Sequence, residues 1–430
     1  MQSIQRNSYL QQLINRKENG LVKIITGIRR CGKSYLLFKL YYNYLLSIGV
    51  NERNIITLAL DEDKNIKYRK PDNLAEFLNK SISNDNETFY IFLDEVQFAI
   101  SKKEIKSKEP IRLYGILNEL IHRGNVDVYV TGSNSKFLSS DVMTEFRGRG
   151  DEVRVYPLSF AEFMSVYQGD KYDGFFDYST YGGLPLVFDR KTETEKIKYL
   201  NDLFNAVYVK DISERHKLKN QMLMDNLLNI VSSSVGSLTN PLKLANSFSS
   251  NGMKVSEKTV SSYINHLIDA YVLSKAERYD IKGKKHINSP YKYYFTDIGL
   301  RNARLNFRQQ EQPHILENII YNELIIRGFN IDVGVVEKYT RDKNGKQKVV
   351  QTEVDFVCNL GSKRYYIQSA FSIPDDEKMK QERTSLLQIN DSFKKFIIVQ
   401  DHIKTWQDEN GFIFMNILDF LLNPDSLNYN

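Results

Sequence analysis

Over the first 160 residues, short apolar runs alternate with longer stretches in which apolar residues recur at helical spacing. The runs at residues 21–26, 54–60, 89–93 and 126–131 have the length of strands buried on both faces. Between them, residues 33–47, 72–82 and 110–123 have the pattern of amphipathic helices. This alternation predicts an α/β domain over residues 1–160, a parallel sheet wrapped by helices with a ligand site at the carboxyl edge of the strands.

After residue 160 the pattern changes and predicts three further domains. Residues 161–218 are mostly helical and fit a small lid over the first domain. Residues 219–300 predict helices at 222–235 and 241–249, a third helix after Ser256, and two strand-like stretches, the order of a winged helix. Residues 301–430 combine a helix from 314, strands at 352–357, 364–368 and 395–399, and a helix at 376–389, which predicts a restriction-endonuclease-like α/β domain.

The turn after the first strand carries the phosphate-binding pattern G-x-x-x-x-G-K-S at Gly27–Ser34. A strand, a Gly-rich turn and a helix are the context that this Walker A motif requires, because backbone N–H groups then converge on phosphates at a helix N-terminus. Lys33 is expected to neutralise the β- and γ-phosphates, and Ser34 to bind Mg²⁺. The residues predicted to contact ATP are Gly27, Ile28, Arg29, Arg30, Cys31, Gly32, Lys33, Ser34 and Tyr35.

A second motif follows about sixty residues later, where the strand at 89–93 ends in Asp94 and Glu95. Asp94 is expected to hold Mg²⁺ through its water shell, and Glu95 to orient or deprotonate the attacking water. Together with the Walker A motif, this pair predicts ATP hydrolysis rather than nucleotide binding alone.

Polar residues after the next strand supply candidates for the remaining catalytic roles. Asn134 is the candidate sensor of the γ-phosphate, with a helix cap as the alternative. Arg147 and Arg149 are candidate arginine fingers, supplied in cis or by a neighbouring subunit of a homo-oligomer, and a structural role is equally open for each. Sequence alone does not rank the two arginines.

Composition indicates a globular protein of several domains, with 41% hydrophobic and 26% charged residues among 430. No apolar run approaches the ~18 residues that span a bilayer, and the N-terminus lacks the apolar stretch of a secretion signal. Two cysteines, one of them inside the phosphate loop, argue against a disulfide framework. We therefore expect a cytoplasmic protein without a membrane partner. The net charge of +6 does not by itself indicate nucleic acid.

The predicted winged helix offers residues for binding duplex DNA. These are Lys258, Ser261 and Ser262 on the third helix and Lys284 and Lys285 in the wing. The third helix carries few cations, so docking to a protein partner is an equally weighted alternative.

The C-terminal domain offers an incomplete metal-dependent nuclease site. Glu317 from a helix, Asp355 from one strand and Gln368 from the next fit the acidic and amide positions of such a site. The lysine expected two residues after Gln368 is replaced by Ala370, and Lys378 is a poor substitute. A degenerate nuclease fold used for docking is therefore favoured over an active nuclease.

Taken together, these motifs resemble a prokaryotic family of AAA-type P-loop ATPases of largely unknown function, over the whole chain. Further stretches typical of that family are Thr131–Ser135, Pro157–Phe163, Gly182–Pro185, Tyr208–Asp211, Tyr294–Gly299, Glu353–Phe356 and Tyr366–Gln368. The resemblance implies an AAA-type fold that uses ATP and Mg²⁺, a winged helix, and a C-terminal PD-(D/E)XK nuclease-like domain. It leaves the partner open. The leading hypothesis is an ATP-hydrolysing switch or motor, and the alternatives are an ATP-regulated DNA-binding protein or a nuclease with an ATPase module.

Overall fold

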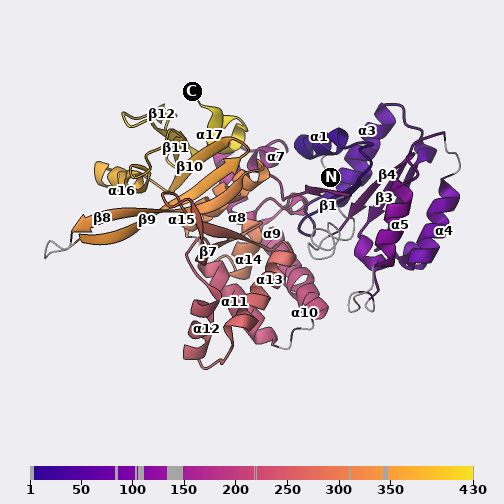
Figure 1. Cartoon of the computed structure of the whole chain (residues 1–430), viewed down its shortest axis with the longest axis horizontal. Coiled ribbons are helices and arrows are strands. Elements are labelled where there is room, and N and C mark those ends of the chain that lie inside the picture. The colour runs from indigo at the N-terminus through magenta and orange to yellow at the C-terminus, as the bar shows by residue number, and fades with distance from the viewer. Residues whose placement is uncertain are drawn as a thin grey trace. The chain divides into compact units, whose positions relative to one another are not determined.

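A computed structural model describes residues 4–82, 86–101, 104, 111–132, 149–216, 218, 220–308, 311–341 and 347–429. The chain divides into two compact units (Figure 1). The first comprises the chain up to Pro157 together with Asp269–Tyr271, and the second comprises Leu158–Ile268 and Val272–Asn430.

The first unit is built on a five-stranded parallel sheet, as the sequence predicts. Its strands lie in the order β2-β3-β4-β1-β5, and every neighbouring pair is parallel. The strands are β1 (Val22–Thr26), β2 (Ile55–Ala59), β3 (Phe89–Asp94), β4 (Val126–Thr131) and β5 (Gly150–Arg154). Because β1 lies between β4 and β5, the turn that follows it opens at the carboxyl edge of the sheet between these two strands.

Helices cover both faces of this sheet, as Figure 1 shows. Leu74 and Leu78 from α4 and Leu113 and Leu117 from α5 share one apolar core with alternate strand residues, Ile24 among them. The helix after β1 runs without a break from Lys33 to Ser47, as predicted for residues 33–47. The helical elements are α1 (Asn7–Asn15), α2 (Lys33–Tyr35), the π-helical η1 (Leu36–Tyr41), α3 (Tyr42–Ser47), η2 (Glu52–Asn54), η3 (Asp63–Arg69), α4 (Pro71–Ser81), η4 (Val96–Ala99) and α5 (Arg112–Ile121).

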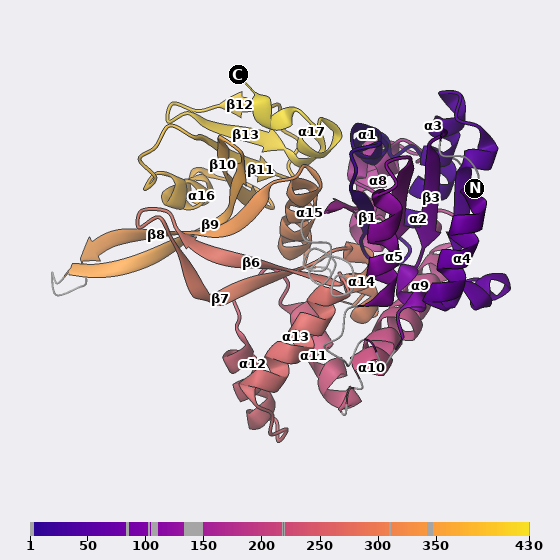
Figure 2. The same ribbon diagram turned by 45° about the vertical axis from the view of Figure 1, so that its right-hand side comes forward.

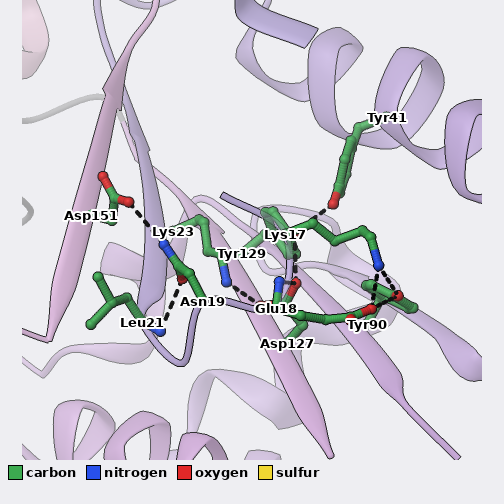
Figure 3. A network of polar contacts seen from close by, with 10 residues as sticks. All are labelled: Lys17, Glu18, Asn19, Leu21, Lys23, Tyr41, Tyr90, Asp127, Tyr129 and Asp151. Atoms are coloured by element: carbon green, nitrogen blue, oxygen red, sulfur yellow. Dashed lines mark hydrogen bonds and ion pairs between the residues drawn. The ribbon is translucent and has the colours of Figure 1, made fainter. Parts of the chain in front are cut away.

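The other face of the sheet holds a buried polar network (Figure 3). The Lys23 ammonium pairs with the Asp127 carboxylate, and the two side chains are 0% and 3% exposed. The second Asp127 oxygen accepts from the Tyr129 hydroxyl at 2.7 Å and from the Glu18 backbone N–H at 2.9 Å. Tyr129 in turn contacts the hydroxyl of Tyr41. The carboxylate thus has a full set of donors inside the domain, as a buried charge requires.

The second unit begins with helices, in agreement with the helical pattern after residue 160. A loop at Gly182 and Gly183 is held by Asp297, whose carboxylate accepts from the Gly183 N–H at 2.8 Å and from Leu300 N–H at 3.1 Å. A Cβ at Gly182 would lie 2.2 Å from that carboxylate, so only glycine fits. The helices are α7 (Phe160–Met164), α8 (Lys171–Tyr181), η6 (Pro185–Val187), α9 (Glu193–Asp202), η7 (Leu203–Val209), α10 (Lys210–His216), α11 (Gln221–Ser233), α12 (Pro241–Ser250) and α13 (Glu257–Asp269).

The rest of the second unit is organised by an eight-stranded mixed sheet in the order β12-β13-β11-β10-β9-β8-β6-β7. Figure 2 shows β8 and β9 extending beyond the other strands as a two-stranded ribbon. The strands are β6 (Leu273–Asp280), β7 (Lys285–Phe295), β8 (Asn330–Arg341), β9 (Gln347–Leu360), β10 (Lys363–Ala370), β11 (Lys394–Val399), β12 (Trp406–Gln407) and β13 (Phe412–Asn416). The helices are α14 (Ile298–Arg304), α15 (Gln312–Ile326), α16 (Asp376–Leu386), α17 (Ile417–Leu422) and η8 (Ser426–Asn428).

One feature of this sheet differs from the sequence expectation. The predicted wing strands, β6 and β7, form an antiparallel pair, but β6 also pairs in parallel with β8 through Arg278, Tyr279 and Asp280. The strands before and after the expected domain boundary at residue 300 therefore belong to one continuous sheet. Hydrogen bonds between strands far apart in sequence create this continuity, and no local pattern signals it.

Candidate functional site

The Gly27–Ser34 turn connects β1 to the long helix, in the place that the sequence predicts. Gly27 has a φ of +135°, and a Cβ there would lie 2.0 Å from the carbonyl oxygen of Val155. Gly32 has a φ of +101° and Arg30 a φ of +66°, so the turn includes two further left-handed residues. The backbone can reverse tightly here only because glycine occupies the most crowded position.

Lys33 lies inside the turn. Its side chain is buried, and its ammonium donates to the carbonyl oxygens of Gly27 at 3.0 Å and Ile28 at 3.1 Å. The positive charge is therefore held within the loop that the sequence assigns to phosphate, beside the first turn of the helix.

Arg6, which sequence reasoning missed, supports the turn from the N-terminal segment. It is 3% exposed, and its guanidinium donates to the carbonyl oxygens of Cys31 at 2.9 Å and Tyr156 at 2.8 Å. Cys31 is itself buried, with Sγ donating to Val155 O at 3.3 Å. Arg6 therefore ties the turn to the segment after β5. No motif marks a lone arginine 25 residues before its partner.

Asp94, at the end of β3, is brought to Ser34 at the start of the helix. The Asp94 side chain is 7% exposed, and burial raises the pKa of its carboxyl group, while hydrogen bonds from Thr131 and Ser34 lower it. Carboxylate and hydroxyl oxygens are the ligands that Mg²⁺ prefers, so the donor set present fits this ion. The structure thus brings together the two residues predicted to hold the metal.

Thr131, at the end of β4, contacts both acidic residues of the second motif. Its hydroxyl donates to the Asp94 carboxylate and accepts from the Glu95 backbone N–H at 3.1 Å. This contact follows from the register, because Leu93 lies opposite Val130 and the next residues on each strand then meet. Sequence reasoning placed a polar group at this edge but chose Asn134.

Glu95 has an unusual backbone conformation for a residue that carries a side chain. Its φ of +50° lies in the left-handed region, which costs of the order of 1–3 kcal/mol for non-glycine residues. The Gln97 amide donates to its carboxylate. Surrounding contacts thus fix the direction of the carboxylate that is predicted to act on water.

The other predicted catalytic residues are placed differently. Asn134 and Arg147 lie outside the described residues. Arg149 is exposed and pairs with the His122 ring at 2.8 Å. Its carbonyl oxygen accepts from Val22 N–H, so it lies at the amino edge of the sheet, opposite the phosphate turn. At this position Arg149 does not fit the role of an arginine finger for the nucleotide of its own chain. It stays a prediction only as a finger supplied by a neighbouring subunit.

The residues predicted to bind DNA lie on α13 and on the turn between β6 and β7. Lys258 and Ser262 are exposed, and Ser261 is half-buried. Lys284 is exposed in the turn, where its φ is +52°, and Lys285 is exposed at the start of β7. The side chains are accessible to a partner, which is what either DNA binding or protein docking requires.

The nuclease-like residues are brought together in the second unit. Lys292 on β7 forms ion pairs with Glu317 and Asp355, and the Asp355 N–H donates to Gln368 Oε1 at 3.4 Å. Lys378 instead pairs with Glu382 on its own helix at 2.6 Å. Sequence reasoning missed Lys292 because it lies on β7, 25 residues before Glu317, whereas the lysine of such a site is expected two residues after Gln368.

Comparisons with known proteins agree with the first unit's architecture. A family model described as an AAA domain matches residues 19–164, and one described as a domain of unknown function, DUF8612, matches residues 172–311. An uncharacterized protein of Haemophilus influenzae is 31% identical over 424 residues, covering 97% of this chain and 98% of its own length. An uncharacterized protein of Methanocaldococcus jannaschii is 26% identical over 404 residues, which cover 90% of this chain and 82% of its own length.

A solved structure of a Walker-type ATPase of Pyrococcus abyssi is 16% identical, covers 70% of this chain and 96% of its own, and has a TM-score of 0.48. The AAA-domain match confirms the predicted P-loop fold of the first unit. Across the part of the chain that the structure describes, no helix combines the length and the apolar character needed to span a bilayer.

Proposed function

This chain, which carries an AAA domain, belongs to one family with its Haemophilus influenzae relative, and from that premise we propose that it is an Mg²⁺-dependent ATPase. The observation that carries the proposal is the convergence of Lys33, Ser34, Asp94 and Glu95 at one edge of the sheet. Each side chain comes from an element that the sheet itself fixes, so the group is organised before nucleotide arrives.

In this proposal each residue has a distinct task. The turn's backbone and Lys33 bind the phosphates of ATP, and Lys33 leaves the loop carbonyls to do so. Ser34 and Asp94 would hold Mg²⁺, which would supply positive charge against the phosphates. Glu95 orients the attacking water and accepts its proton, while Thr131 keeps the two acidic residues in register.

The ATP cycle would act on the second unit as a switch or small motor. Support for a nucleic-acid partner comes from the helices α11, α12 and α13, the following strand pair, and the exposed Lys258, Lys284 and Lys285. A protein partner would use the same exposed surface. A homo-oligomer would place Arg149 of one copy against the nucleotide of another.

Phosphate release by the purified full-length protein tests the proposal. Lys33→Ala should abolish turnover, because the phosphates lose their neutralising charge. Lys39→Ala is the matched control, since Lys39 lies on the same helix and is exposed. Equal turnover in wild type and Lys33→Ala, with or without DNA, would remove the enzyme assignment.

A gel-shift series with labelled duplex separates the two kinds of partner. If DNA is bound, replacing Lys284 and Lys285 with alanine should weaken binding and reduce the salt slope by about one for each lysine that neutralises a phosphate. Failure of the wild type to shift any duplex at low salt would favour the protein partner.

A further inference from the structure

A group of three carboxylates in the second unit surrounds a single ammonium ion. Lys292 Nζ lies 2.9 Å from Glu317 Oε1, 2.6 Å from Glu353 Oε1 and 3.5 Å from Asp355 Oδ1. We call these four residues the Lys292 cluster. Glu317 comes from α15, and Glu353 and Asp355 come from β9, so two elements bring carboxylates to a cation carried by a third, β7.

Lys292, Glu317 and Asp355 are largely buried and well supplied with hydrogen bonds, whereas the Glu353 side chain is 31% exposed. The Lys292 side chain is 4% exposed, and those of Asp355 and Glu317 are 10% and 12% exposed. The Tyr294 hydroxyl donates to Glu317 Oε1 at 2.7 Å, and the Ser369 N–H donates to Asp355 Oδ2 at 2.9 Å. The positions of the Glu317 and Asp355 carboxylates are therefore set by the fold and not by Lys292 alone.

Electrostatics keep the ammonium charged in this position. Burial by itself would lower the pKa of Lys292, but the carboxylates of Glu317, Asp355 and Glu353 outweigh it and raise the pKa above its usual range. Burial also raises the pKa of Glu317 to about 7, against the opposing effect of Lys292. One positive charge thus faces three acidic groups.

The ammonium lies where these carboxylate oxygens converge, which is the position that a divalent cation bound by them would need. Mg²⁺ binds carboxylate oxygens at about 2.0–2.1 Å, so it cannot share this position with an ammonium ion. The Gln368 side chain lies beside the cluster, where its Oε1 accepts from the Asp355 backbone N–H at 3.4 Å. Within the described ranges of the chain, no group of three His, Cys, Asp or Glu side chains is placed to hold a metal ion, so these carboxylates would have to move closer together after the ammonium is removed before they could bind one.

We propose that Lys292 is a built-in cation that takes the place of a divalent metal ion in this cluster and closes it to metal. Removing the ammonium should therefore open a divalent-cation site formed by Glu317, Glu353 and Asp355. The proposal concerns the second unit and does not depend on ATP hydrolysis by the first.

Binding of Mn²⁺ to the full-length protein, followed by electron paramagnetic resonance, tests the proposal. All proteins carry Asp94→Asn, which removes a predicted metal ligand of the ATPase site. Adding Lys292→Met should add one bound Mn²⁺ per chain and make the thermal unfolding temperature rise with Mn²⁺. A further Asp355→Asn should abolish both effects, and Lys285→Met, a control on the same strand with an exposed side chain, should show neither.

Two results would overturn the proposal. One is a folded Lys292→Met protein that gains no Mn²⁺. The other is that the protein with Lys292 intact binds Mn²⁺ and that Asp355→Asn abolishes this binding. The second measurement does not require Lys292→Met to fold, so the parent protein alone can decide: a melting temperature indifferent to Mn²⁺ supports a closed cluster, and an Asp355-dependent rise refutes it.

Discussion

The buried pair of Lys23 and Asp127 in the first unit provides a quantitative test of how this sheet is held together (Figure 3). The informative change is Asp127→Asn, because asparagine keeps an oxygen acceptor for Tyr129 and Glu18 while removing the negative charge. It leaves the Lys23 ammonium inside the domain without a charged partner. Burial already lowers the pKa of Lys23, and the Asp127 carboxylate opposes that effect.

The expected cost follows from the burial of both partners. Since Lys23 is 0% and Asp127 3% exposed, solvent cannot replace the missing charge. Breaking such a pair from one side typically costs about 3–5 kcal/mol, whereas removing both charges is often close to neutral. Adding Lys23→Met to Asp127→Asn should therefore restore most of the stability. For a unit of this size, the single variant should melt roughly 6–20 °C lower.

Differential scanning calorimetry of the full-length protein measures this effect. The transition that ATP moves upward marks the first unit, because ligands stabilise the part to which they bind. Asp72→Asn is the control, since Asp72 pairs with Arg112 on the surface at 83% and 56% exposure and should cost about 1 kcal/mol or less. A single variant as stable as this control, or a double variant less stable than the single, would refute the reasoning.

Three further predictions concern the site and the second unit. Arg6→Ala should weaken ATP binding about tenfold in a fluorescent-nucleotide titration, because the charge-assisted bonds to Cys31 O and Tyr156 O are removed. Thr131→Val should lower kcat on the order of a hundredfold with affinity nearly unchanged, as phosphate-release kinetics would show. Burial raises the pKa of Asp297 from 3.8 to about 6, so between these pH values the folded state binds a proton that the unfolded state has released. The free energy of unfolding should therefore fall as the pH rises through this range. Asp297→Asn should flatten that part of a urea-unfolding pH profile.

Arg16→Ala, which removes a partly exposed pair with Asp151, should leave ATP affinity unchanged, and an equal loss in both variants would argue against a positioning role for Arg6. Thr57→Val on the exposed side of β2 should keep full turnover. An unchanged pH profile in Asp297→Asn would show that this carboxyl group does not titrate in the window.

The sequence predicts the first unit well because its signals are local. Apolar runs of strand length mark four of the five strands of the parallel sheet, β1 to β4, and the phosphate turn requires glycine within a few residues of Lys33. The predicted helices at 222–235 and 241–249 also agree closely with α11 and α12.

What the sequence does not reveal depends on contacts between distant residues. Arg6 reaches the phosphate turn, and Lys292 reaches Glu317 and Asp355, through tertiary packing that leaves no spacing rule. The lysine expected two residues after Gln368 is absent from β10, while Lys292 on β7 forms ion pairs with Glu317 and Asp355. The junction of β6 with β8 is hidden for the same reason.

The central claim is tested most directly by measuring ATP binding and phosphate release together in wild type and Glu95→Gln. Glutamine preserves size and hydrogen bonding but cannot accept a proton from water. We predict that the variant binds ATP as tightly as wild type and loses turnover by about a hundredfold or more. Turnover unchanged in Glu95→Gln would contradict the role assigned to Glu95, and turnover absent from wild type under all conditions would contradict the assignment of this protein as an ATPase.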